Sequence, residues 1–312
     1  MSKEQRGRRH RQPQQRPARP ASRVPAPVAR RDWQSDPRYA GSSPLRGRPG
    51  AVATLLERLS GDQLVELLMP HLWASIVEGI PSNTCVDACH TLRYAYGQFG
   101  LRSELQPVSL MVRNGQGETV VDTAEEPWWS ADGSIFHGHC VLGLPDCLRV
   151  VDPTVEQFAP VRELGQGPLV GRTIAAEPPA QAGRLMAPGT LFAVQRGDCR
   201  LLYTVAADRY TDVVRDQEWI TAHAPAYYRT GVNLASMMIL ALRIPDVIGR
   251  ARQTPYPRLH ALLRVIGDAQ EEIDDARDLR FRIMVDGVIQ ALRLDEIPLP
   301  ATTPAPGVPN PA

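Results

Sequence analysis

Apolar positions recur at helical spacing where the hydrophobic part of the chain begins. Leucines between Ala51 and Leu72 repeat every three or four residues, and the pattern breaks near Gly61. A second helix is predicted from about Cys85 to Phe99, because Asn and Thr residues that can cap a helix precede it and a Gly follows it. The sequence therefore predicts that the ordered part of the chain begins with helices.

The pattern then changes to short apolar runs separated by Gly, Pro and Asp turns. The predicted strands are Leu105–Val112, Thr119–Asp122, His139–Leu144, Cys147–Val151, Thr190–Gln195 and Cys199–Val205, of which the last two form a hairpin. Helices return from Asn233 and end in a long amphipathic helix from about Pro257 to Arg293. This order predicts an α+β fold, in which N-terminal helices pack on an antiparallel sheet and a helical C-terminal extension follows.

Composition divides the chain into four parts. Residues 1–50 contain thirteen Lys or Arg residues, three acidic residues and eight prolines, which predicts a disordered Arg/Pro-rich tail. Residues 51–210 form the predicted main domain, residues 211–296 a helical extension packed on the same domain, and residues 297–312 a disordered Pro-rich tail. The basic tail solubilises the protein or binds an acidic partner such as nucleic acid.

Bulk composition is typical of a soluble globular protein, with 43% hydrophobic and 22% charged residues. No run of about 18 apolar residues predicts a membrane span, and the Arg-rich first thirty residues lack the apolar stretch of a secretory signal. The five cysteines are an odd number without the spacing of a disulfide scaffold, which indicates reduced thiols and a cytoplasmic protein.

Cys85 is the thiol best placed for chemistry. It opens a predicted helix, where free N–H groups and the helix dipole stabilise a thiolate and lower the pKa of a cysteine. Cys89 lies one turn further along the helix and is interpreted as a small packing residue. Cys85 itself could also be an inert buried cysteine.

A thiol nucleophile needs a base, and the base needs a group that orients it. If the strands from His139 and Cys147 form a hairpin with a symmetric loop about Pro145-Asp146, His139 faces Asp152 directly, with Cβ atoms roughly 4.5–5.5 Å apart. His137 lies two residues earlier, on the same face of the strand, and competes for the role of base. Asp152-Pro153 is also a good strand terminator, and His139 could be a core histidine.

Together these residues resemble the transglutaminase-like branch of the papain-type cysteine enzymes. In that family a cysteine begins a helix, an Asp follows two residues later, a His opens a strand and an Asp-Pro-Thr closes the next strand. The matching residues here are Cys85, Asp87, His139 and Asp152-Pro153-Thr154, within residues 83–154.

The resemblance implies a papain/transglutaminase-like core and a catalytic domain over residues 51–210. It implies thiol-dependent acyl transfer or hydrolysis at the carbonyl of a peptide, amide or thioester, without a metal or an organic cofactor. Cys85 would be the nucleophile, His139 the base and acid, and Asp152 the group that orients the imidazole.

Further residues are candidates for contacting the substrate. The family usually has an oxyanion-stabilising side chain upstream of the cysteine, for which Asn83 and Trp73 are the candidates beside the backbone N–H of Cys85. Trp128 and Trp129 line an acyl-binding groove or cover the core.

Three other interpretations remain open. An arylamine N-acetyltransferase-like enzyme uses the same order of Cys, His and Asp, although the sequences flanking Cys85 and Asp152 differ from that family. A catalytically inactive adaptor would bind an acidic partner through the Arg-rich arm. A zinc site is disfavoured because the Cys and His spacings match no compact zinc motif. Its candidate ligands are Cys85, Cys89, His90, His137, His139, Cys140 and Cys147. The sequence does not determine the oligomeric state.

Overall fold

The computed structural model describes residues 47–77, 84–131, 133, 135–172, 185–215, 217–267, 269–275 and 278–308. Its helices are α1 (Gly47–Arg58), α2 (Leu64–Ile76), α3 (Cys85–Gln98), α4 (Ala159–Arg162), α5 (Glu218–Leu242), α6 (Pro245–Ala251) and α7 (Pro257–Ile266). Short 3-10 turns are η3 (Gly61–Gln63), η4 (Val155–Gln157), η5 (Asp208–Tyr210), η6 (Asp212–Val214) and η7 (Leu294–Glu296). Of the predicted tail over residues 1–50, residues 1–46 lie outside the described residues. Residues 47–50 do not belong to a disordered tail, because α1 begins at Gly47.

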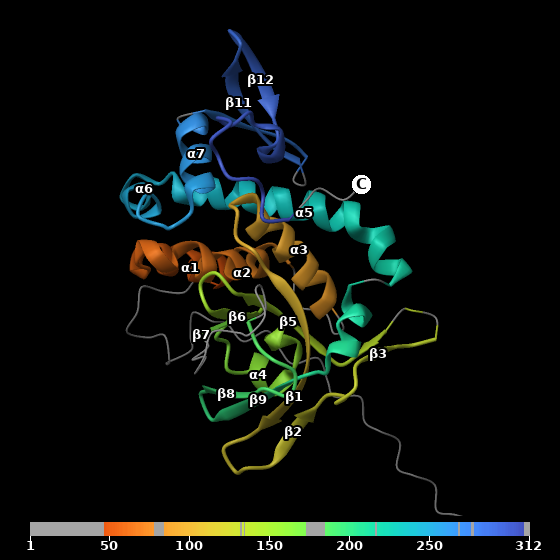
Figure 1. The fold of residues 1–312 in the computed structure, drawn as a ribbon. Helices are drawn as coiled ribbons and strands as arrows, with labels where there is room; N and C mark the ends of the chain where they lie inside the picture. The colour runs from red at the N-terminus through yellow and green to blue at the C-terminus, as the bar shows by residue number, and fades with distance from the viewer. Residues whose placement is uncertain are drawn as a thin grey trace, which may run out of the picture. The chain divides into compact units, whose positions relative to one another are not determined.

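The described strands form antiparallel sheets, as the sequence predicts. They are β1 (Glu104–Arg113), β2 (Thr119–Asp122), β3 (Trp128–Trp129), β4 (Phe136–His137), β5 (His139–Leu144), β6 (Arg149–Asp152), β7 (Leu169–Arg172), β8 (Leu191–Arg196), β9 (Cys199–Val205), β10 (Gln270–Asp275), β11 (Asp278–Val285) and β12 (Val288–Leu292). The largest sheet has the order β7-β6-β5-β1-β9-β8, with β2 also paired to β1 (Figure 1). Strand β3 pairs with β4 in a separate two-stranded sheet. The α+β class is therefore confirmed.

Helix α3 lies between this sheet and α5 (Figure 1). One face of α3 packs on β5, where the Cys89 thiol donates a hydrogen bond to the Cys140 carbonyl at 3.5 Å. On the opposite side, Gly231 of α5 comes so close to α3 that a Cβ atom there would lie 2.7 Å from the Thr91 carbonyl oxygen and 2.7 Å from the Tyr94 Cβ. The start of α3 is thus held between two layers.

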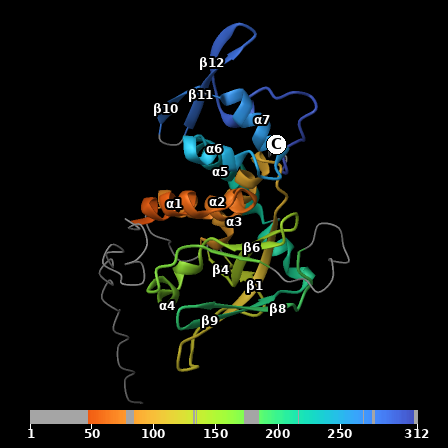
Figure 2. The same ribbon diagram turned by 90° about the vertical axis from the view of Figure 1, so that its left-hand side faces the viewer.

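The C-terminal part differs from the predicted long helix over Pro257–Arg293. Helix α7 ends before Gly267, and a three-stranded sheet in the order β10-β11-β12 follows (Figure 2). Strand β11 buries alternate residues, and Asp286 and Gly287 both adopt positive φ angles, as a two-residue hairpin turn requires. The prediction was wrong because the apolar residues change from helical spacing in α7 to alternation in β11.

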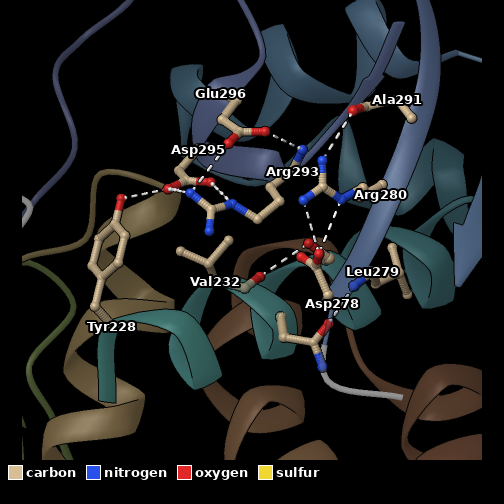
Figure 3. A network of polar contacts seen from close by, with 11 residues as sticks. Tyr228, Val232, Asp278, Leu279, Arg280, Ala291, Arg293, Asp295 and Glu296 are labelled. Carbon is tan, nitrogen blue, oxygen red and sulfur yellow. Dashed lines mark hydrogen bonds and ion pairs between the residues drawn. The ribbon is translucent and has the colours of Figure 1, made fainter. Parts of the chain in front are cut away.

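Polar contacts fix this small sheet to α5 (Figure 3). The Tyr228 hydroxyl donates to Asp295 at 2.9 Å, and the Leu279 amide donates to the Asn233 side chain at 3.0 Å. Within the sheet, Arg280 forms an ion pair with Asp278 at 2.9 Å. The predicted helical extension over residues 211–296 therefore contains strands as well as helices. Its contact with the preceding part of the chain is made by α5, which packs against α3.

The chain after the sheet also differs from the prediction of a loose tail. Ile297 and Val308 are buried, and the Gly307 amide donates to the Gly97 carbonyl at the end of α3 at 2.8 Å. A Cβ atom on Gly307 would lie 2.5 Å from the Leu101 carbonyl oxygen, which shows how closely this segment approaches the chain after α3. The prolines here stiffen a segment that packs.

Among the described helices, none alone is long and apolar enough to cross a bilayer. Helices α5 and α6 together meet the length and composition requirements, but the chain bends by 113° between them.

Candidate active site

Cys85 is the first residue of α3 and is 1% exposed. The first helical hydrogen bond runs from the Ala88 amide to the Thr84 carbonyl at 2.9 Å. The amides of Cys85, Val86 and Asp87 therefore precede the helical ladder and point toward the N-terminal end of α3. Such amides can stabilise negative charge on a nearby sulfur or oxygen.

The predicted contact between His139 and Asp152 is present, but the predicted register was wrong. The Nε2 atom of His139 lies 2.7 Å from Oδ2 of Asp152. Leu142 pairs with Val151, so the hairpin is shifted by two residues from the register that would place His139 opposite Asp152. The loop is centred one residue later than expected, and an even shift keeps both side chains on one face of the sheet.

Two further groups hold the Asp152 carboxylate. The Tyr203 hydroxyl donates to Oδ2 at 2.9 Å, and the Thr154 amide donates to Oδ1 at 3.1 Å. Tyr203 reaches this place because Val108 of β1 pairs with both His139 and Val205, which puts β5 and β9 on either side of β1. Sequence reasoning missed Tyr203, because an aromatic residue in an alternating strand has the pattern of a core residue.

Gln157 is a second residue that the sequence analysis missed. Its side-chain nitrogen lies 3.1 Å from Nδ1 of His139, on the side of the ring away from Asp152. Arg162 fixes this turn by donating to the carbonyls of Glu156 at 2.9 Å and Gln157 at 2.8 Å. The only sequence signal was the position of Gln157 five residues after Asp152.

Cys85 and His139 influence each other's protonation, and burial acts against the charged form of each side chain. Burial is the strongest influence on His139 and opposes its protonation, but Asp152 and Cys85 together outweigh it and raise the pKa of His139 to about 10. Burial raises the pKa of the Cys85 thiol, and the hydrogen bond with His139 opposes that shift. The expected lowering of the Cys85 pKa is therefore wrong for this closed site, because the loss of water outweighs the helix terminus and the imidazole.

The other four cysteines have different partners. Their thiols donate to backbone carbonyls or, for Cys199, to Asp198 at 3.8 Å. Burial raises the pKa of Cys147 to about 12, and burial also raises that of Cys89. Across the described ranges, no three or more His, Cys, Asp or Glu residues are arranged to hold a metal ion.

The remaining predicted substrate residues are more scattered. Asn83 lies outside the described residues. Trp73 is buried in the hydrophobic core. Trp128 is half exposed and stacks on His137 with ring centroids 3.9 Å apart, so that the His137 ring lies against Trp128. The Trp129 indole donates to the Val213 carbonyl at 2.7 Å, which ties strand β3 to η6.

Asp87, the acidic residue of the motif, faces α5 and not the imidazole. The Tyr227 hydroxyl donates to its carboxylate at 2.5 Å. Burial raises the pKa of Asp87, and the hydrogen bond from Tyr227 partly offsets that effect. Asp87 therefore fixes the start of α3 against α5.

Comparison with protein-family models, with curated proteins and with solved structures gave no match. The resemblance in the motif from Cys85 to Thr154 therefore depends on the residues themselves and on the geometry just described.

Proposed function

We propose that this protein is a cysteine acyltransferase or amidase with a papain/transglutaminase-like core. The observation that carries the proposal is the chain of contacts from the Cys85 thiol through His139 to Asp152, with 2.7 Å between Nε2 and Oδ2. The order of a helix with Cys, a strand with His and a neighbouring strand with Asp supports the same family of folds. The substrate would be a peptide, another amide or a thioester.

The reaction begins with transfer of the Cys85 proton to His139. Asp152 accepts the Nε2 hydrogen bond, so that Nδ1 is the nitrogen that serves the thiol. The raised pKa of His139 favours this transfer, because the resulting imidazolium is stabilised by Asp152. Gln157 can turn its amide to meet Nδ1 with either its oxygen or its nitrogen as the proton moves.

The thiolate then attacks the carbonyl carbon, and the carbonyl oxygen takes the displaced electron pair. The first amides of α3 are placed to stabilise this oxyanion. When the tetrahedral intermediate collapses, the leaving amine or thiol takes the proton from His139 and a thioester remains on Cys85. An amine or water then attacks the thioester, and its proton passes back through His139 to the thiol.

The test is to treat the full chain with p-nitrophenyl acetate and locate the acetyl group by peptide mass spectrometry. We expect a thioester on Cys85 that turns over when hydroxylamine is added. It should be absent in Cys85→Ala and retained in Cys199→Ala, the matched control. His139→Ala should slow acylation by about 10²–10⁴-fold, the usual contribution of a general base. Acetylation of other cysteines at the same rate as Cys85 would contradict the proposal.

A further inference from the structure

The hairpin of β11 and β12 exposes apolar side chains at its tip. Met284, Val288 and Ile289 are 63%, 60% and 57% exposed, and they lie within six residues of one another. Met284 pairs directly with Ile289 across the hairpin, so these two side chains lie on the same face. Val288 pairs with Val285 and therefore lies on the other face, so the exposed apolar pair on the first face is Met284 and Ile289. Adjoining exposed apolar side chains on an ordered hairpin are typical of an interaction surface.

Strand β12 also forms an edge of its sheet. Among the described strands, the order β10-β11-β12 gives β12 a neighbour on one side only, and its sequence Val-Ile-Gln-Ala-Leu contains no charge and no proline. Proteins usually protect sheet edges with charges, prolines or bulges, because unpaired N–H and C=O groups recruit another strand. Strand β12 itself carries none of these devices; the one charged group that reaches it among the described residues is Arg280 of β11, which donates to the Ala291 carbonyl at 3.4 Å.

The opposite edge of the same sheet is protected. Strand β10 carries four acidic residues in six, Glu271, Glu272, Asp274 and Asp275. Two copies of β10 would repel each other, whereas two copies of β12 would bring no charges together. The charge pattern therefore leaves β12 as the edge of this sheet that a second copy of the chain can join.

We propose that β12 pairs with β12 of a second copy in an antiparallel, two-fold arrangement centred on Ile289. This register continues the sheet to six strands with the same face outward. It places Met284 and Ile289 of one copy in a row with Ile289 and Met284 of the other, which covers the two exposed side chains on that face. Centring on Gln290 instead would set Ile289 against Ala291 and leave the row of four apolar side chains broken.

The contacts with α5 allow this pairing. In the network of Figure 3, the Tyr228 hydroxyl of α5 donates to Asp295, and the Leu279 amide of β11 donates to the Asn233 side chain of α5. Buried Phe281 and Ile283 face the core from β11, so the inner face is already occupied. The tip of the hairpin and the free side of β12 remain for a partner.

The first measurement is the mass of the full chain by sedimentation over a range of micromolar concentrations. We expect a species of twice 34.4 kDa in the wild type, and a return to 34.4 kDa in Ile289→Lys. Leu191→Lys is the matched control, because Leu191 is 66% exposed on β8, the edge of the other sheet, and this change should leave the dimer intact. Circular dichroism confirms that both variants fold.

The second measurement tests the register by disulfide formation on mild oxidation. Ile289→Cys should give a covalent dimer, because the two-fold axis brings both introduced thiols together. Gln290→Cys should not, because its copies lie two residues out of register and beyond the reach of a disulfide. A wild type that stays monomeric, a dimer that survives Ile289→Lys, or crosslinking through Gln290→Cys instead of Ile289→Cys would each overturn the proposal.

Discussion

Replacing Asp152 with Asn should change the protonation of His139 more than any other single substitution. The carboxylate is fully buried and accepts a hydrogen bond from Nε2 at 2.7 Å. Asn keeps the shape of the side chain and removes its charge. Burial, the strongest influence on His139, would then act without its main opponent, and the pKa of His139 should fall from about 10 to below its ordinary value of 6.5.

The size of the effect follows from the pKa. A shift from about 10 to below 6.5 corresponds to about 5 kcal/mol, since each unit is worth about 1.36 kcal/mol. Because the folded-state pKa is raised, this stabilisation is fully present below pH 6.5 and is lost as the pH rises through 10. The stability difference between wild type and Asp152→Asn should therefore be largest below pH 6.5 and shrink toward pH 10.

The assay is an NMR titration of histidine ring protons, with the His139 signal assigned by its loss in His139→Asn. Urea unfolding at several pH values measures the stability difference. Tyr203→Phe is the control, because it removes one hydrogen bond to Asp152 and leaves the charge in place. A His139 signal that titrates at the same pH in Asp152→Asn and in wild type would refute the reasoning.

Three further predictions concern His90, Gly231 and Gln157. Burial lowers the pKa of His90 to about 4, so the free energy of unfolding of the wild type should fall by up to about 3 kcal/mol as the pH falls from 6.5 through 4. In His90→Gln the free energy of unfolding should depend less on pH over this range, as measured by urea unfolding at several acidic pH values. Gly231→Ala should lower the free energy of unfolding by about 1–3 kcal/mol, because its Cβ would meet α3, whereas Gly249→Ala, with no described atom within 4 Å, should be neutral or stabilising in urea denaturation. Gln157→Ala should slow acetylation of Cys85 and change the pH dependence of that rate. Gln157→Glu should move the pH dependence to higher pH, because it adds a negative charge beside Nδ1 of His139. An unchanged pH profile in both variants would contradict a role for Gln157 beside His139.

The sequence was most informative where one local signal determined the structure. Strand β5 and helix α3 begin at the predicted residues, because the strand has a turn before and after it and the helix follows a capping segment. The register of β5 and β6 was not predictable to the residue. It depends on how the four-residue loop 145–148 closes, including a positive φ angle at Leu148.

Tertiary contacts determined what the sequence did not show. Tyr203 is 51 residues from Asp152 and meets it only because β1 pairs with strands from both sides. The pKa of Cys85 depends on how completely the surrounding layers exclude water, which no local motif reports. The C-terminal sheet was missed because the helical spacing of α7 was extended past Gly267, where the pattern becomes alternating.

The dispersal of the site along the chain has a consequence for the nascent protein. Cys85 emerges from the ribosome long before His139, Asp152 and finally Tyr203 of β9. During that interval the thiol cannot contact His139, and the contacts of His139 with Asp152 and of Asp152 with Tyr203 require β5, β6 and β9 to be paired around β1. The thiol of Cys85 would therefore acquire its contact with His139 only when these strands have been synthesised and the sheet has formed.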